Sequence, residues 1–112
     1  MIKKGRINPE KFYHAILKLK TVEECATFFE DVCTIQEIES ISQRFDVAIE
    51  LYRGKSYAEI NKTIPVSTAT ISRVNRALTY GDGGYLTVIE RMEEDDDWPK
   101  YFKVWRKNCI LP

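Results

Sequence analysis

The sequence predicts an all-α protein, and three observations support this prediction. Helix start and stop signals recur along the 112 residues, apolar side chains between them repeat at helical spacing, and no alternating strand pattern exceeds four residues. The length suits one domain, and 44% hydrophobic residues suffice for a packed core. A chain this small buries a limited part of its surface, so dimerisation would help. We expect residues 1–97 to form a helical domain.

Two helices are predicted in the first third of the chain. Asn8 followed by Pro9 is typical of an N-cap with proline at the first helical position, and this helix should run through Lys20. Thr21 and Glu24 form a capping-box pattern that opens the second helix. The apolar face of the second helix should comprise Val22, Cys25, Phe28, Phe29 and Val32.

A third helix, over residues 35–53, should be the longest. The capping-box pair Thr34 and Glu37 opens it, and Gly54 is placed to end it in a left-handed turn. Its apolar stripe comprises Ile38, Ile41, Phe45, Ala48 and Tyr52.

The next segment predicts a helix-turn-helix motif. Ser56 caps a short helix that runs through Ile64, Pro65 interrupts the pattern, and Ser67 caps a helix that runs to about Tyr80. Two short helices separated by three or four residues are the signature of this motif. The residues expected to pack inward are Ile60, Ile64, Val66, Ile71, Val74 and Leu78.

The last third of the chain begins with a Gly-Asp-Gly-Gly connector at residues 81–84. A final helix should follow from Tyr85 to about Glu94, with Leu86, Ile89 and Met92 facing inward. An acidic break at residues 93–97 precedes a tail, residues 98–112. Trp98, Phe102 and Trp105 in this tail have the spacing of an amphipathic helix that docks on the domain or on a partner.

The net charge is zero, yet the charges are segregated along the chain. Residues 1–20 hold six basic residues and one acidic residue, whereas residues 81–97 hold seven acidic residues and one basic residue. The predicted helix-turn-helix, residues 56–80, holds three basic residues and one acidic residue, a net of +2. Phosphate neutralisation supplies much of the affinity of DNA-binding proteins, and this segment can present a positive face.

Several functional classes find no support. The three cysteines lack zinc-site spacing and the sole histidine has no ligand partner, so we expect no metal site and a reducing, cytoplasmic environment. No apolar run approaches the roughly 18 residues of a membrane span, and no signal peptide follows Lys3 and Lys4. No nucleophile–base pair, carboxylate dyad or phosphate loop is visible, so the sequence does not indicate an enzyme.

The outer face of the second motif helix suits a DNA major groove. Its short, hydroxyl-rich residues allow close approach to base edges, and hydroxyls and a methyl group can contact those edges. The helix N-terminus adds a partial positive charge for phosphate binding. The residues expected to contact DNA are Lys55, Ser56, Tyr57, Lys62, Ser67, Thr68, Ala69, Thr70, Ser72, Arg73, Asn75 and Arg76.

From Thr34 to Leu78 the sequence resembles the Trp repressor family. The segment Glu50–Gly54 resembles the family's link between its long helix and the helix-turn-helix, and Ala69–Arg73 resembles its recognition-helix signature. The similarity to the YerC/YecD-type branch rests on Cys33–Ile38, Gln43-Arg44 and Ser67–Val74. Pro65 departs from the usual pattern, which often has glycine in the turn.

The resemblance implies a Trp repressor-like fold that forms an intertwined homodimer. Two recognition helices would enter successive major grooves of double-stranded DNA, which predicts a palindromic operator with half-sites about one helical turn apart. This half-site spacing is that of the Trp repressor itself, and it applies to this chain only through the resemblance.

The resemblance also bears on an effector. In the repressor, tryptophan lies between two arginines with a threonine nearby, positions that match Arg44, Arg73 and Thr34. The repressor has glycine after the second arginine, whereas this chain has Val74, whose side chain should fill the space for the indole. Three alternatives follow for the control of DNA binding: tryptophan as the effector, which Val74 disfavours, a different small-molecule effector, or DNA binding that needs no ligand.

Two functions fit these features. The first is a sequence-specific transcriptional regulator, a repressor by resemblance, that acts as a dimer. The alternative is a protein-interaction module that keeps the helix-turn-helix as a scaffold and uses the acidic residues 93–97 and the aromatic tail.

Overall fold

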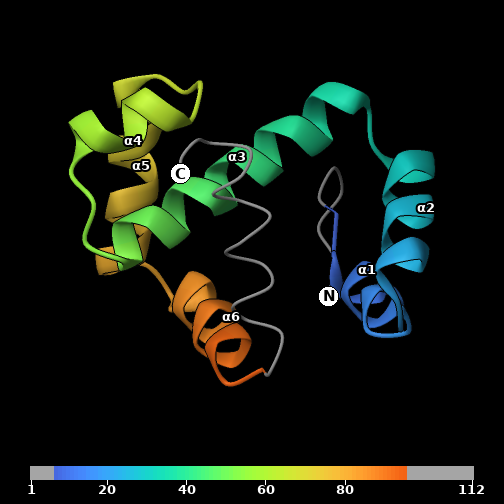
Figure 1. Cartoon of the computed structure of the whole chain (residues 1–112). Coiled ribbons are helices and arrows are strands. Elements are labelled where there is room, and N and C mark those ends of the chain that lie inside the picture. Colours follow the sequence, from blue (N-terminus) through green and yellow to red (C-terminus); the bar gives the residue numbers. More distant parts are fainter. Residues whose placement is uncertain (1–6, 96–112) are drawn as a thin grey trace. The chain divides into compact units, whose positions relative to one another are not determined.

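A computed structural model describes residues 7–95 of the chain, and these residues contain helices and connecting turns but no strand. The all-α prediction is confirmed. The helices are α1 (Glu10–Ile16), α2 (Val22–Val32), α3 (Ile35–Tyr52), α4 (Tyr57–Thr63), α5 (Thr68–Tyr80) and α6 (Gly84–Glu93) (Figure 1). The described residues divide after Ile38 into two compact units, residues 7–38 and 39–95. The predicted tail, residues 98–112, lies outside the described residues.

Helix α1 begins and ends differently from the prediction. Pro9 is its N-cap, and the side-chain oxygen of Asn8 accepts a hydrogen bond from the Glu10 amide at 3.1 Å. The predicted N-cap, Asn8, was therefore one residue too early. The predicted end at Lys20 was wrong too, because α1 ends at Ile16. After it, the amides of Lys18 and Leu19 bond carbonyls three residues back, which is the tighter pattern of a 3₁₀ turn.

Residues 7–38 are held together by a cluster of three phenylalanine rings. Phe12 of α1 stacks on Phe28 of α2 at 5.8 Å between centroids, and Phe29 meets both rings edge-on at 6.3 and 5.5 Å. None of the described residues in this unit is buried. The predicted apolar face of α2 is thus only partly covered, since Val22 and Val32 are 77% and 52% exposed.

The predicted caps of α2 and α3 form, with one difference. Thr34 and Glu37 bond reciprocally through the Thr34 amide at 2.8 Å and the Glu37 amide at 3.1 Å, a complete capping box. Thr21 accepts the Glu24 amide at 3.0 Å, but the Glu24 carboxylate accepts the amide of Lys20 instead of Thr21. At each of the two helix starts, side chains therefore accept two backbone amides.

The turn from α3 to α4 is the left-handed turn predicted at Gly54. Gly54 has φ +88°, its amide bonds the Leu51 carbonyl, and the Lys55 amide bonds the Glu50 carbonyl, both at 3.0 Å. This pair of bonds is a Schellman motif. It ends α3 at Tyr52 and fixes where α4 begins.

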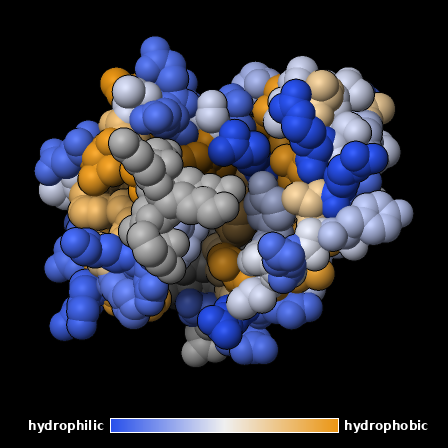
Figure 2. All heavy atoms as spheres, turned by 180° about the vertical axis from the view of Figure 1, so that it is seen from behind, coloured by the Kyte–Doolittle hydropathy of each residue, from blue (hydrophilic) through white to orange (hydrophobic). Residues whose placement is uncertain are grey.

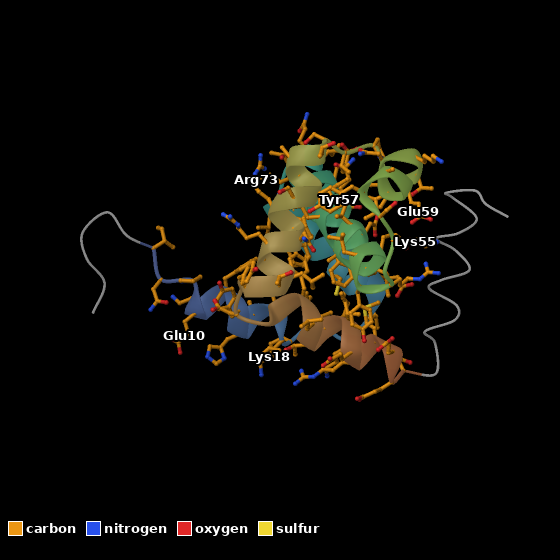
Figure 3. The ribbon with its side chains drawn as sticks, turned by 90° about the vertical axis from the view of Figure 1, so that its left-hand side faces the viewer. Glu10, Lys18, Lys55, Tyr57, Glu59 and Arg73 are labelled. Atoms are coloured by element: carbon orange, nitrogen blue, oxygen red, sulfur yellow. The ribbon has the colours of Figure 1, made fainter. Side chains whose placement is uncertain are left out.

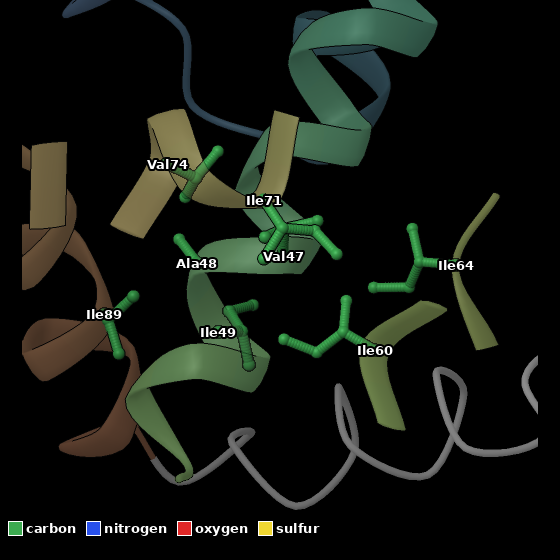
Figure 4. Packing of buried hydrophobic residues seen from close by; sticks show 8 residues of the cluster. All are labelled: Val47, Ala48, Ile49, Ile60, Ile64, Ile71, Val74 and Ile89. Atoms are coloured by element: carbon green, nitrogen blue, oxygen red, sulfur yellow. The ribbon is translucent and has the colours of Figure 1, made fainter. Parts of the chain in front are cut away.

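The second unit, residues 39–95, surrounds one apolar core (Figure 4). Residues from the end of α3 meet side chains from α4, α5 and α6, all nearly inaccessible to solvent. The core comprises Val47, Ala48, Ile49, Ile60, Ile64, Ile71, Val74 and Ile89. Half-buried Leu78, Leu86 and Met92 follow the predicted inward positions. This shared core fixes α4 and α5 as a helix-turn-helix, which confirms that prediction.

Helix α6 is attached to the same unit at both of its ends. Its N-cap is Gly83, with φ +87°, and it begins one residue before the predicted Tyr85. Tyr85 stacks on Phe45 of α3 at 6.4 Å, and the Tyr52 hydroxyl donates to the Glu93 carboxylate at 2.7 Å. This charged acceptor raises the pKa of the Tyr52 hydroxyl above its ordinary value.

Candidate nucleic-acid interface

The turn between α4 and α5 accommodates proline without a left-handed residue. Ile64 ends α4 through its amide bond to the Ile60 carbonyl, and the Val66 amide then bonds the Ile64 carbonyl at 2.8 Å. Pro65 is the middle residue of this three-residue γ-turn, a position from which no amide hydrogen is needed. Ser67 follows and caps α5 by accepting the Thr70 amide at 3.1 Å.

The start of α4 is fixed by a complete capping box. The Ser56 hydroxyl accepts the Glu59 amide at 3.2 Å, and the Glu59 carboxylate accepts the Ser56 amide at 2.8 Å. The hydrogen bond from the Ser56 backbone amide lowers the pKa of the Glu59 carboxyl most, and the hydrogen bond with the Ser56 side chain lowers it further. Lys55 next to this cap is exposed (Figure 3), so a cation lies beside the first turn of α4.

A buried carboxylate supports the turn before α4. The Glu50 side chain is 8% exposed and accepts a hydrogen bond from the Arg53 guanidinium at 3.0 Å. Burial raises the pKa of Glu50, and the positive charge of Arg53 partly opposes this shift. Glu50 lies in the last turn of α3 and Arg53 lies directly after that helix. Their pairing therefore stabilises the turn that leads into α4.

Helix α5 has one buried side and one exposed side. Ile71 and Val74 are 0% and 2% exposed against the core. The exposed side carries five of the residues predicted to contact DNA, namely Thr68, Ala69, Ser72, Arg73 and Arg76. Thr70 and Asn75 are half-buried at the edge of this side. The structure thus brings the predicted recognition-helix residues together on one open surface.

The residues predicted to contact DNA in and around α4 differ in their exposure and in their hydrogen bonds. Lys62 is exposed in the last turn, whereas Tyr57 is half-buried with its ring against the core. Ser56 and Ser67 both use their hydroxyls to cap helices. Ser67 also bonds the Thr70 hydroxyl at 3.0 Å. Some of the residues predicted to contact DNA therefore already use their side-chain polar groups in hydrogen bonds within residues 7–95.

Asn61 of α4 was not among the predicted site residues. Its amide nitrogen donates to the Thr68 hydroxyl at 3.4 Å, which places it beside the start of α5. A contact between two elements leaves no local sequence pattern, so helix signals could not reveal it.

The helix-turn-helix carries a net positive charge. Residues 55–80 hold four cations, Lys55, Lys62, Arg73 and Arg76, against the single acid Glu59. None of these four cations forms an ion pair within residues 7–95. Residues 81–95 hold five acids and Arg91. The neutral sum for the whole chain therefore hides a cationic helix-turn-helix, a suitable field for an anionic partner.

Other kinds of site find no geometric basis in the described part of the chain. Across residues 7–95, no group of His, Cys, Asp or Glu side chains is arranged to hold a metal ion. Among the helices of the same residues, none combines the length and apolar character of a membrane span.

Comparison with known proteins identifies the family. The sequence model of the family described as Trp repressor protein matches residues 8–93, which is most of the chain. The chain belongs to the Trp repressor family. This match extends over both units and includes the whole helix-turn-helix, well beyond the segment 34–78 that carries the resemblance in the sequence.

Three relatives place the chain within the Trp repressor family. It is 45% identical over 87 residues to YerC of Bacillus subtilis (strain 168), an uncharacterized protein, covering 78% of this chain and 84% of that one. A TrpR-like protein from Eubacterium eligens ATCC 27750 superposes with a TM-score of 0.73 at 54% identity, over 75% of this chain and 87% of that chain. A candidate Trp repressor from Staphylococcus aureus has a TM-score of 0.73 at 44% identity, over 77% and 86%.

The three residues predicted to form an effector pocket in this Trp repressor relative lie in different units. Thr34 lies in residues 7–38, where its hydroxyl caps α3. Arg44 and Arg73 lie in residues 39–95, and both are exposed. Val74, which follows Arg73, is 2% exposed and belongs to the core. The Val74 side chain therefore packs among the core residues of the unit 39–95.

Proposed function

We propose that this protein is a cytoplasmic, dimeric, sequence-specific DNA-binding regulator of transcription. The observation that carries the proposal is the exposed side of α5, where Ser72, Arg73 and Arg76 face solvent while Ile71 and Val74 anchor the helix. Arginine and hydroxyl side chains recognise base edges and phosphates. The family membership supports the same function and gives no support to an enzyme.

The charge of the motif supports binding to the DNA backbone. Lys55 and Lys62 lie on α4 or directly before it, and Arg73 projects from α5 (Figure 3). The N-termini of α4 and α5 add partial positive charge. Under this proposal the lysines and Arg76 bind phosphates, whereas Ala69 and Ser72 approach bases.

A homodimer is part of the proposal. Apolar side chains reach the surface between hydrophilic ones (Figure 2), and in residues 7–38 they include Ile7, Leu17, Val22 and Ile35, at 89%, 79%, 77% and 72% exposed. A second copy would cover them. Two recognition helices related by two-fold symmetry would then bind a palindrome with half-sites about 10 base pairs apart.

Regulation by tryptophan is not part of the proposal. The buried Val74 supports this view because a branched side chain fills the position where the resemblance implies space for the indole. A different small effector at Arg44 and Arg73 remains compatible with their exposure. We expect DNA affinity without any added amino acid.

Selection of bound sequences from a random duplex pool tests the proposed function. The wild-type protein, at low salt and with or without tryptophan, should enrich a two-fold symmetric sequence to the same degree. Ser72→Ala should weaken binding to the enriched duplex about 2- to 10-fold, the effect of losing one hydrogen bond. Failure to bind any duplex at low salt would exclude the function.

The oligomeric state requires its own measurement. Sedimentation equilibrium should give twice the chain mass of 13.1 kDa. Val22→Asp should shift the protein toward the monomer, because a carboxylate would have to be buried without a partner in the interface. Glu23→Gln on the same helix is the matched control and should leave the mass unchanged. A wild-type monomer at all concentrations would contradict the dimer.

A further inference from the structure

One polar contact joins the two helices of the motif. Among residues 7–95, the bond from the Asn61 amide to the Thr68 hydroxyl, at 3.4 Å, is the one side-chain hydrogen bond between α4 and α5. Apolar residues of the two helices, such as Ile60 and Ile71, also share the buried core. Apolar contacts have little directional preference, whereas a hydrogen bond constrains the orientation of both groups.

The direction of this bond determines what Thr68 offers to a partner. A threonine hydroxyl has one proton to donate and two lone pairs that accept. Because its oxygen accepts from Asn61, its proton is left available to groups outside the protein. Thr68 is exposed and is the first residue of α5, where DNA would approach under the proposed function.

The neighbouring hydroxyls are arranged differently. Ser67 accepts the Thr70 amide, and the Ser67 and Thr70 hydroxyls bond each other at 3.0 Å. One of their two protons is therefore used inside the protein, and because either oxygen can be the donor of that bond, the hydrogen bonds do not assign the other proton to one of the two hydroxyls. Thr68 differs from both, because the bond from Asn61 defines its oxygen as the acceptor and leaves its own proton for a partner.

We propose that Asn61 is a positioning residue that fixes the Thr68 hydroxyl as a hydrogen-bond donor toward the DNA. This inference rests on the proposed function. Guanine presents N7 and O6 as acceptors in the major groove, adenine presents N7 and thymine presents O4, whereas cytosine presents an amino donor. The base facing Thr68 should therefore be one that presents an acceptor, and cytosine should be disfavoured there.

Replacing the amide by a carboxylate provides a sharp test. Asn61→Asp keeps the size of the side chain but can only accept, so the Thr68 proton would turn inward. Thr68→Val removes the hydroxyl at constant shape, and Thr68→Ser retains it. The new negative charge of Asn61→Asp weakens binding to all duplexes alike, so the measured quantity must be a ratio of affinities between bases.

The experiment uses the full-length protein, a duplex enriched from a random pool, and its single-base variants. Wild type and Thr68→Ser should disfavour cytosine at one position per half-site. Asn61→Asp and Thr68→Val should reduce that discrimination about 3- to 10-fold at that position only. Lys62→Ala, the adjacent exposed cation, is the control and should lower all affinities while leaving the ratio unchanged.

Three results would overturn the inference. First, the discrimination against cytosine could survive in both Asn61→Asp and Thr68→Val. Second, it could be lost in the control Lys62→Ala as well. Third, it could be lost in Thr68→Val and survive in Asn61→Asp. The last result would mean that Thr68 contacts DNA without being oriented by Asn61. Circular dichroism of each variant separates these results from loss of the fold. Failure of the proposed function is distinguishable, because the wild type would then bind no duplex.

Discussion

Residues 7–38 and residues 39–95 are both helical, yet their apolar side chains have different surroundings. Within the described chain, the eight buried hydrophobic residues all belong to residues 39–95. Residues 7–38 have a phenylalanine cluster but no buried side chain, and Leu17 and Val22 are more than three-quarters exposed. One chain alone therefore encloses a core around the helix-turn-helix and leaves its first helices uncovered.

This difference shows what an apolar helical pattern does and does not specify. The face of α2 and the inner side of α5 have the same type of amphipathic spacing, yet only α5 has side chains that its own chain buries completely, whereas the Phe12 ring covers the face of α2 in part. The spacing predicts that a face becomes buried, and it does not predict which molecule buries it. Under the proposed homodimer, the partner of α2 is a second copy.

The largest expected effect is on the core of the second unit. Ile71→Ala should lower the free energy of unfolding by about 2–5 kcal/mol, because the side chain is fully buried and leaves a cavity. Urea unfolding followed by circular dichroism measures this loss. Val88→Ala on α6, 47% exposed, is the control and should change the free energy by about 0.5 kcal/mol or less. Equal losses would show that burial does not separate these positions.

A second substitution tests whether the two units differ in stability. Phe28→Ala removes two ring contacts, with Phe12 and Phe29, and should cost residues 7–38 about 1–3 kcal/mol. Hydrogen exchange should accelerate in residues 7–38 and stay slow in the core of residues 39–95. If both units exchange faster to the same degree, they unfold together and the contrast between them is wrong.

The turn that leads into the motif should be sensitive to its glycine. Gly54→Ala should cost about 1–2 kcal/mol, because φ +88° is unfavourable for a residue with a Cβ atom. Thermal unfolding should show the loss as a lower Tm. Gly84→Ala is the matched control, since its Cβ would meet nothing within 4 Å and α6 would gain a better helix former. A Tm that falls more for Gly84→Ala would refute the role of the left-handed turn.

The smallest expected effect is a pH dependence at the start of α4. The pKa of Glu59 is lowered from its ordinary value of 4.5 by its bonds with Ser56, so its stabilising contribution is present above that value. The contribution is lost as the pH falls through the lowered pKa. The difference in unfolding free energy between wild type and Glu59→Gln should therefore shrink on acidification, and a difference that grows would contradict the capping box.

Local signals predicted the helix-turn-helix well. The bounds of α5, Thr68 to Tyr80, follow from the Ser67 cap and from Gly81, where any Cβ would overlap the Ala77 carbonyl. Gly54 likewise adopts the predicted left-handed turn. These features depend on backbone conformation and neighbouring residues, so a single sequence contains them.

Features that depend on contacts between elements were predicted less well. The end of α1 was wrong because the tightening of the chain at Leu17–Leu19 has no residue-specific stop signal. Asn61 was missed because its partner is in the next helix. The half-buried position of Tyr57 was likewise not visible from its place at a helix start.

The central claim is that the exposed side of α5 binds the phosphates and bases of duplex DNA. Its most direct test is the salt dependence of binding to the enriched duplex, compared between wild type and Arg76→Ala. The slope of log K against log salt should fall by about 0.9 for each phosphate contact removed, hence by about 1.8 in a dimer. An unchanged slope in Arg76→Ala, or a wild type that binds no duplex at low salt, would contradict the account.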